Sequence, residues 1–257
     1  MTGGDKMNLL QRYINKDLPG RIRNRVLPNL RHLTKSRIRQ CRACQRISLF
    51  VQFAEHEEFR VCFRCTANLR YEMLAEHIRG MGDLSTADVL ELDPASPISL
   101  LLSGARSHVR SYYRPGHVPG TIREDGARME DITRLTFPND SLDLIVSSDV
   151  LEHVPDAHAA FRESFRVLRP GGAHLFTVPN EPATIRRAIL ESGEVRHLVP
   201  DPEYHSDPLD RNGILAFWHF GPDMNEQFGE CGLQFSVVRG PEGVQRRILW
   251  LAEKPTA

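Results

Sequence analysis

Short apolar runs alternate with amphipathic segments from residue 87 onward. The runs predict strands at 87–92, 108–113, 126–130, 142–147 and 174–178. Between them, residues 97–103 and 156–168 predict helices, the second with Phe161, Phe165 and Leu168 on one stripe. Strands that alternate with helices indicate an α/β fold with a doubly wound, mostly parallel sheet covered on both faces.

The last part of the chain predicts a different strand pairing. A helix at 222–228 is followed by strands at 234–239 and 246–253. The loop between these strands, Gly240-Pro241-Glu242-Gly243, has the length of a hairpin connection, so the two strands should be antiparallel neighbours. The predicted sheet therefore has seven strands and ends in an antiparallel pair.

The first 80 residues predict a separate, smaller part. Apolar positions at spacings of three or four, interrupted by prolines, predict two or three short helices before residue 41. Residues 47–53 alternate like a strand, and residues 67–79 predict a helix that ends at Gly80. The predicted organisation is a basic helical arm at 1–40, a module at 41–80 whose two cysteine pairs would bind zinc and which ends in a linker helix, and the α/β domain at 81–257 with a lid insertion at about 179–220.

The charge of the chain is balanced overall but uneven along its length. There are 33 Lys and Arg against 33 Asp and Glu, yet residues 1–46 hold twelve basic side chains against only Asp5 and Asp17. A basic arm can bind nucleic acid or an anionic surface. Tyr13 is the only aromatic residue there that could stack on a base, so we favour a solvated arm, or docking onto the acidic remainder, over nucleic acid.

Four of the five cysteines form two C-x2-C pairs separated by seventeen residues: Cys41, Cys44, Cys62 and Cys65. Zn²⁺ prefers four thiolates in a tetrahedron, and each pair supplies two ligands. No apolar run approaches the roughly 20 residues of a transmembrane segment, and the first residues are too polar for a signal peptide. We therefore expect a cytoplasmic protein with a structural zinc ion, although in a secreted protein the four could form two disulfides. Cys231 stands alone and is interpreted as a small apolar residue.

Several motifs carry chemistry within the α/β part. They are Glu91-Leu92-Asp93-Pro94-Ala95, Met129-Glu130-Asp131-Ile132, Leu142-Asp143-Leu144-Ile145-Val146, Asp149-Val150-Leu151-Glu152-His153-Val154 and Arg166-Val167-Leu168-Arg169-Pro170-Gly171-Gly172. In this order and spacing they resemble class I S-adenosylmethionine (SAM)-dependent methyltransferases over roughly residues 87–180, and the seven-strand layout is the one that this family has. The paired-cysteine module and a later block, Tyr204-His205-Ser206-Asp207-Pro208, resemble a subgroup in which a proline-containing turn replaces the glycine-rich one.

The resemblance implies a SAM site at strand ends and in the turns that follow them. The implied cofactor-binding residues are Glu91, Asp93, Pro94, Ala95, Tyr112, Asp131, Ile132 and Ser148. The first four would flank the methionine part of SAM, Asp131 would accept a hydrogen bond from the adenine amino group, and Ile132 would offer its amide to the ring. The chain departs from the family in two places. The first turn has no glycine, and Tyr112 stands near the place of the usual ribose-binding acid.

Four residues are candidates for proton transfer: His205, His153, Asp149 and His219. A neutral imidazole can take a hydroxyl proton as a methyl group leaves the sulfonium, although methyl transfer can also proceed by positioning alone. His205 ranks first because it lies in the long segment 179–220, where the family inserts acceptor-binding lids, and such long segments are usually functional. His219, beside Trp218, is as readily interpreted as a packing residue.

We therefore predict a SAM-dependent methyltransferase that acts on a hydroxyl of a small molecule or glycan. Two alternatives stay open. One is an RNA methyltransferase that holds its substrate with the basic arm and zinc module, which a steep salt dependence of RNA binding would reveal. The other is a degenerate domain that serves as a binding or scaffold protein, suggested by the glycine-free turn and the missing ribose acid.

Overall fold

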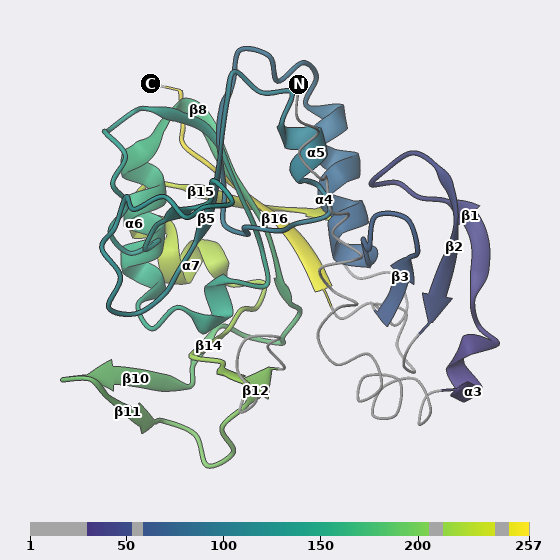
Figure 1. Ribbon diagram of the computed structural model, residues 1–257. Helices are drawn as coiled ribbons and strands as arrows, with labels where there is room; N and C mark the ends of the chain where they lie inside the picture. Colours follow the sequence, from purple (N-terminus) through teal and green to yellow (C-terminus); the bar gives the residue numbers. More distant parts are fainter. Residues whose placement is uncertain (1–29, 53–58, 206–212, 240–246, 257) are drawn as a thin grey trace.

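A seven-stranded sheet forms the centre of the molecule. The computed structural model describes residues 30–52, 59–205, 213–239 and 247–256 (Figure 1). In spatial order, the strands of the sheet are β15 (Gln234–Arg239), β16 (Arg247–Glu253), β8 (Leu168–Pro179), β7 (Leu142–Ser148), β4 (Asp88–Glu91), β5 (Ser107–Tyr112) and β6 (Arg128–Met129). The last five in this order are mutually parallel, whereas β16 is antiparallel to both β8 and β15. The predicted mostly parallel sheet with an antiparallel end is thus confirmed.

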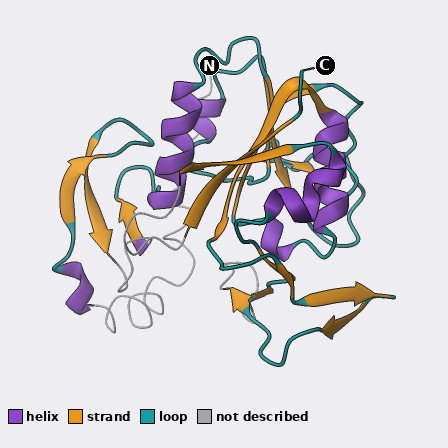
Figure 2. Ribbon diagram, turned by 180° about the vertical axis from the view of Figure 1, so that it is seen from behind, coloured by secondary structure: helices purple, strands orange, loops and turns teal. Residues whose placement is uncertain are grey.

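Helices cover both faces of this sheet (Figures 1 and 2). One face carries α4 (Leu69–Gly80) and α5 (Ser99–Leu102), and the other carries α6 (Ala157–Val167) and α7 (Met224–Phe228). Side chains of a strand point alternately to opposite faces. In β7, Leu144 and Val146 accordingly join the core under α4, whereas Ile145 joins the core around Phe161 of α6. The apolar run Leu144-Ile145-Val146 in β7 follows from this burial on both sides.

The cysteine-containing part is a small antiparallel sheet packed beside α4. It consists of β1 (Arg37–Gln40), β2 (Ile47–Gln52) and β3 (Arg60–Cys62), with a short helix α3 (Leu30–Leu33) before them. Residues 37–40 are thus a strand where the sequence predicted part of a helical arm. Their backbone pairs with β2, and Arg39 reaches Glu72 of α4 at 2.7 Å while lying over the ring of Phe50. Residues 1–29, most of the predicted arm, lie outside the described residues.

The described residues of the segment 179–220 form short strand pairs. The pairs are β10 (Ala188–Glu191) with β11 (Glu194–His197), β12 (Tyr204–His205) with β13 (Ile214–Leu215), and β14 (Trp218–His219) with β9 (Ile185–Arg186). Two 3₁₀ turns, η4 (Leu151–His153) and η5 (Gly229–Cys231), complete the described elements. The sequence predicted little regular structure in this segment, because strands of two to four residues show no readable period. None of the described helices has the length and apolar character that a membrane crossing needs.

Candidate functional site

The residues predicted to bind the cofactor converge on one edge of the sheet. Glu91 ends β4, Tyr112 ends β5, Ser148 ends β7, and Asp131 follows β6 by two residues. Carboxyl ends of parallel strands share an edge, and ligands of such sheets bind in the crevice where the strand order reverses, here between β4 and β7. The structure therefore gathers these residues at the edge where an α/β sheet usually binds its ligand.

Glu91 is buried with only part of its hydrogen-bonding capacity used. Its Oε2 accepts a hydrogen bond from Ser99 Oγ at 2.7 Å and lies 2.9 Å from His108 Nε2. Its Oε1 is also buried but has no hydrogen-bond partner among the described residues. Leaving a buried acceptor unpaired costs about 1–3 kcal/mol, so a donor from a bound ligand would stabilise this position.

The glycine-free turn after β4 is held by side chains. Asp93 Oδ1 accepts a hydrogen bond from the Ala95 amide at 2.8 Å, and Asp93 Oδ2 accepts one from the Tyr71 hydroxyl at 2.7 Å. Burial, and then the nearby charge of Asp93, raises the pKa of Tyr71, which keeps this hydroxyl a donor. The Pro94 carbonyl accepts a hydrogen bond from Arg110 at 2.8 Å. The turn is therefore fixed by its neighbours, and the Asp93 carboxylate is engaged within the protein.

The other predicted cofactor residues differ in how they are held. Asp131 Oδ1 accepts two hydrogen bonds from Thr133, from its amide at 2.9 Å and its hydroxyl at 2.7 Å, and Ile132 is largely buried. The Tyr112 ring lies under the guanidinium of Arg123, at 4.7 Å. Ser148 shares a hydrogen bond of 3.1 Å with Thr177. These contacts fix the backbone at the ends of β5, β6 and β7.

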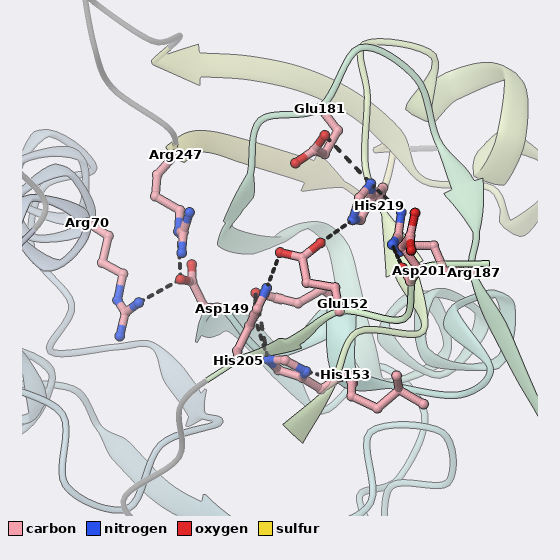
Figure 3. A network of polar contacts seen from close by, with 12 residues as sticks. Arg70, Asp149, Glu152, His153, Glu181, Arg187, Asp201, His205, His219 and Arg247 are labelled. Carbon is pink, nitrogen blue, oxygen red and sulfur yellow. Dashed lines mark hydrogen bonds and ion pairs between the residues drawn. The ribbon is translucent and has the colours of Figure 1, made fainter. Parts of the chain in front are cut away.

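Asp149 is paired with two arginines. Its Oδ2 accepts hydrogen bonds from Arg70 Nη1 at 2.6 Å and from Arg247 Nε at 2.7 Å (Figure 3). Asp149 adopts the left-handed conformation, with φ of 51°. Burial acts to raise the pKa of Asp149, but the two guanidinium groups outweigh it, so the pKa is lowered. Asp149 is thus an ionised anchor that ties α4 and β16 to the end of β7.

His153 and His205, predicted as separate candidates, lie in direct contact. His205 Nδ1 is 3.2 Å from His153 Nε2, and the rings meet edge to face (Figure 3). The outer nitrogens also have partners, because His153 Nδ1 lies 2.9 Å from the Leu215 carbonyl and His205 Nε2 lies 3.0 Å from Glu203 Oε1. The structure therefore brings η4 and the β12–β13 pair together around two imidazoles.

Glu203 joins the two histidines of the 179–220 segment. Its Oε2 lies 2.7 Å from His219 Nε2, while its Oε1 binds His205. Partial burial acts to raise the pKa of Glu203, but the hydrogen bonds from His219 and His205 outweigh it and lower the pKa. His219 is thus part of the polar network and not only a packing residue. Asp207, which belongs to the same sequence block as His205, lies outside the described residues.

Glu152 lies beside the His153–His205 pair and is almost completely buried, with 1% of its surface exposed. Neither carboxylate oxygen has a hydrogen-bond partner on another described residue. Burial raises the pKa of Glu152 well above its ordinary value, and the nearby negative charge of Asp149 raises it further. In the sequence, the only indication that Glu152 belongs to the site is its position next to His153. Glu203, Arg70 and Arg247 were also missed, the last two because nothing in the sequence connects them with Asp149.

The four paired cysteines converge at one point. Their sulfur atoms all lie within 4.8 Å of one another, and Cys41 Sγ is 3.6 Å from Cys65 Sγ. All four are free thiols, and that separation is far longer than the ~2.05 Å of a disulfide bond. A tetrahedral Zn²⁺ with bonds of about 2.3 Å would place its sulfur ligands about 3.8 Å apart. The geometry of this cluster therefore suits a four-thiolate metal ion.

Comparison with known proteins finds similarity in the α/β domain. Residues 116–176 match the family model described as a methyltransferase domain. A ubiquinone biosynthesis O-methyltransferase of Xanthomonas oryzae pv. oryzae is 28% identical over 147 residues, which is 57% of this chain and 55% of that protein. A probable S-adenosylmethionine-dependent methyltransferase of Mycolicibacterium smegmatis is 38% identical over 64 residues, 25% of each chain.

Among solved structures, a SAM-dependent methyltransferase from Mesorhizobium loti aligns with a TM-score of 0.43 and 17% identity, over 68% of this chain and 95% of that one. This chain spans about half the length of the curated Xanthomonas relative that it matches. The family-model match lies within the α/β domain predicted from the sequence. It covers the strands and turns that carry Asp131, Ser148, Asp149 and His153.

Proposed function

We propose that this protein is a SAM-dependent methyltransferase that transfers a methyl group to a hydroxyl of a small molecule. The observation that carries the proposal is the methyltransferase-domain match over residues 116–176, which contains the turn after β6 and the whole of β7. The sheet order supports it independently, because it puts the predicted cofactor residues on the ligand-binding edge.

The residues at this edge fit SAM in their chemistry. SAM supplies a methyl group on a sulfonium that is already activated for transfer. Glu91 keeps one buried acceptor oxygen with no partner in the described part of the chain, which suits the amino group of the methionine part. Asp131 would accept the adenine amino group and the Ile132 amide would bind the ring, while the Tyr112 hydroxyl would take the place of the ribose acid.

The rigid turn explains how a site without glycines can still bind SAM. Asp93 would repel the SAM carboxylate if it faced the cofactor. Its two oxygens instead accept hydrogen bonds from Tyr71 and from the Ala95 amide. We therefore assign the binding of the methionine part to the backbone of Asp93, Pro94 and Ala95, and the shape of the turn to Tyr71 and Arg110.

The acceptor is assigned to the side of the His153–His205 pair. His153 lies in η4, shortly after β7, and the pair is partly open to solvent, with 14% and 24% of the two side chains exposed. We propose that the pair assists loss of the acceptor's hydroxyl proton, whereas Asp149, held by two arginines, positions the end of β7. The curated Xanthomonas relatives are named for O-methylation in ubiquinone biosynthesis, which supports a small-molecule hydroxyl as the acceptor.

We also propose that Cys41, Cys44, Cys62 and Cys65 hold one structural Zn²⁺, which the free thiols and their separations support. The ion would stabilise the module from which α4 starts. Through Arg70 and Tyr71, α4 contacts the ends of both β7 and β4. The zinc site would therefore support the cofactor site indirectly, by fixing the base of this helix.

Calorimetric titration with SAM and with its demethylated product tests the central proposal. Binding of both is expected, followed by transfer of a labelled methyl group to a hydroxylated small molecule. No binding at millimolar SAM would favour the scaffold alternative. Labelling of RNA, together with RNA binding that weakens steeply with salt, would replace the small-molecule acceptor by RNA.

A further inference from the structure

Glu152, His153 and His205 place three ligand-type atoms around one point next to β7. One nitrogen of each histidine and one carboxylate oxygen lie within 4.8 Å of one another. His205 Nδ1 is 3.2 Å from His153 Nε2, and Glu152 Oε1 is 3.9 Å and 4.0 Å from these two nitrogens. This cluster comes from two separate parts of the chain, η4 and β12.

Hydrogen bonds on the outer side of both rings place the proton of each neutral ring on its outer nitrogen. The inner nitrogen of each ring therefore has a lone pair. The Leu215 carbonyl can only accept, so His153 Nδ1 carries the proton and Nε2 is left with a lone pair when the ring is neutral. Glu203 in the same way holds the proton of His205 on Nε2 and leaves a lone pair on Nδ1. The inward nitrogens of two neutral rings would then face each other at 3.2 Å with no hydrogen between them. Such an arrangement needs a cation, which is either an additional proton or a metal ion.

Glu152 adds a carboxyl group to the same point. Its side chain is 1% exposed, and neither oxygen has a hydrogen-bond partner on another described residue. At 3.9 and 4.0 Å the imidazoles are too distant to donate a hydrogen bond to it. The nearby arginines Arg70 and Arg247 are bonded to Asp149. A buried carboxylate without a partner is costly, and metal coordination is one of the usual ways to satisfy it.

We propose that Glu152, His153 and His205 bind one divalent first-row transition-metal ion of the Zn²⁺ or Fe²⁺ class. Two imidazoles and one carboxylate are a known ligand set for such ions. Bonds of about 2.1 Å to a tetrahedral ion place the ligand atoms about 3.4 Å apart, close to the histidine separation, and the carboxylate closes in slightly on binding. Metal-bound histidines usually donate their other N–H to a carboxylate or carbonyl, which here are Glu203 and Leu215.

Three protein ligands leave at least one coordination position for an oxygen ligand. The partial exposure of His205 and His153 gives an ion and a small ligand access from that side. A divalent cation lowers the pKa of a bound oxygen acid, so the ion would favour loss of the proton of an acceptor hydroxyl. This role of the ion rests on the proposed function. Binding of the ion does not rest on it, and neither SAM nor an acceptor is needed to measure it.

Metal counting on the full chain tests the proposal. Wild type, Glu152→Gln, His205→Gln and the double variant Cys62→Ser with Cys65→Ser are loaded with Zn²⁺, dialysed against metal-free buffer and analysed by elemental mass spectrometry. The wild type should hold one ion more than Glu152→Gln and His205→Gln, and the double cysteine variant should keep this ion. His197→Gln, at an exposed histidine of β11, is the matched control and should match the wild type. Titration with Co²⁺ should give the extra site a spectrum without thiolate charge-transfer bands.

Glu203→Gln provides a second test that leaves all three ligands in place. Weakening of the outer hydrogen bond should reduce Co²⁺ affinity at this site by about 10- to 100-fold. Equal ion counts in wild type and Glu152→Gln, or unchanged Co²⁺ affinity in Glu203→Gln, would show that the cluster holds only a proton and would overturn the proposal. SAM binding is measured separately, so failure of the metal site and failure of the proposed function are distinguishable.

Discussion

The hydroxyl of Tyr71 donates a hydrogen bond of 2.7 Å to Asp93 Oδ2, which connects α4 to the turn after β4. Tyr71 lies six residues after Cys65, the last cysteine of the module, and Asp93 is the second residue after β4. The neighbouring Arg70 reaches the end of β7 in the same way through Asp149. Two adjacent side chains of one helix therefore tie the cysteine module to both strands that border the proposed SAM site.

Tyr71→Phe should lower the free energy of unfolding by about 1–3 kcal/mol, because the Asp93 carboxylate loses a donor in a partly buried position. Urea denaturation measures this change. SAM affinity should fall as well, because the glycine-free turn loses one of its supports. Tyr204→Phe is the matched control, since Tyr204 is 51% exposed and lies on β12, and it should change neither quantity. Equal stability and SAM affinity in Tyr71→Phe and wild type would contradict a supporting role for this contact.

Strands and helices with a strong apolar pattern were predictable, whereas exposed elements were not. β7 and α6 were predicted within one or two residues because both bury a continuous run or a stripe of apolar side chains. Residues 37–40, with the sequence Arg-Ile-Arg-Gln, were not recognised as β1 because most of their side chains are exposed, so backbone pairing with β2 decides their structure. The short strands β9–β14 were missed because strands of two to four residues show no readable period.

In the candidate site, the sequence predicted single residues that belong to a motif, but it did not predict the contacts between them. The sequence identified His153 and His205 separately, but their contact joins residues 52 apart and depends on how the 179–220 segment folds back onto η4. Glu152 is adjacent to His153, yet its burial without a partner is visible only in three dimensions. The two arginines on Asp149 come from positions 79 and 98 residues away. Such non-local charge pairs have no signature in a single sequence.

Asp131→Ala should weaken the binding of SAM and of its demethylated product by about 1–3 kcal/mol each, because the proposed acceptor for the adenine amino group is lost. Calorimetry with both ligands measures this change. Asp83→Ala is the control, since Asp83 lies in an exposed turn before β4, far along the strand from the ligand-binding edge, and bonds only Ser85 among the described residues. If Asp131→Ala bound SAM as tightly as the control, Asp131 would have no part in the adenine site.

Replacing both Cys62 and Cys65 by Ser should lower the zinc content by one ion per chain and destabilise the module. Structural zinc contributes about 10–16 kcal/mol of apparent binding free energy in small zinc domains, so loss of two ligands should prevent tight binding. Elemental analysis and thermal denaturation provide the measurements. Cys231→Ser is the matched control because Cys231 lies apart from the four-sulfur cluster. An unchanged metal content in the double variant would contradict zinc binding at these cysteines.

His174 should make the protein less stable as the pH falls below about 6.5. It is completely buried between Ser147 and Ser164, and burial lowers its pKa to about 3. The unfolded chain takes up a proton below about pH 6.5, whereas the folded chain does not until about pH 3, so the stabilisation is complete above the first value and is lost below it. From pH 6.5 to pH 4.5 the free energy of unfolding should fall by about 2–3 kcal/mol.

Urea denaturation at several pH values measures this dependence. His174→Gln should show a flatter profile in the same range, and His197→Gln, at an exposed site, should retain the wild-type profile. Parallel profiles for wild type and His174→Gln would mean that another group dominates the acid sensitivity of the protein.

His205→Ala should reduce methyl transfer while leaving SAM binding nearly intact. His205 lies on the acceptor side, in contact with His153 and Glu203, and none of its described contacts reaches the predicted SAM-binding residues. Assistance with a hydroxyl proton is typically worth about 10²- to 10⁴-fold in rate, and we expect kcat to fall on that scale with SAM affinity within about twofold. His197→Ala should keep wild-type kinetics.

If His205 only packed the β12–β13 pair, the His205→Ala variant would lose thermal stability and acceptor affinity together while kcat at saturating acceptor stayed near the wild-type value. Measurement of kcat, KM for the acceptor and melting temperature on the three proteins separates these cases, and full turnover in His205→Ala would remove His205 from the active site.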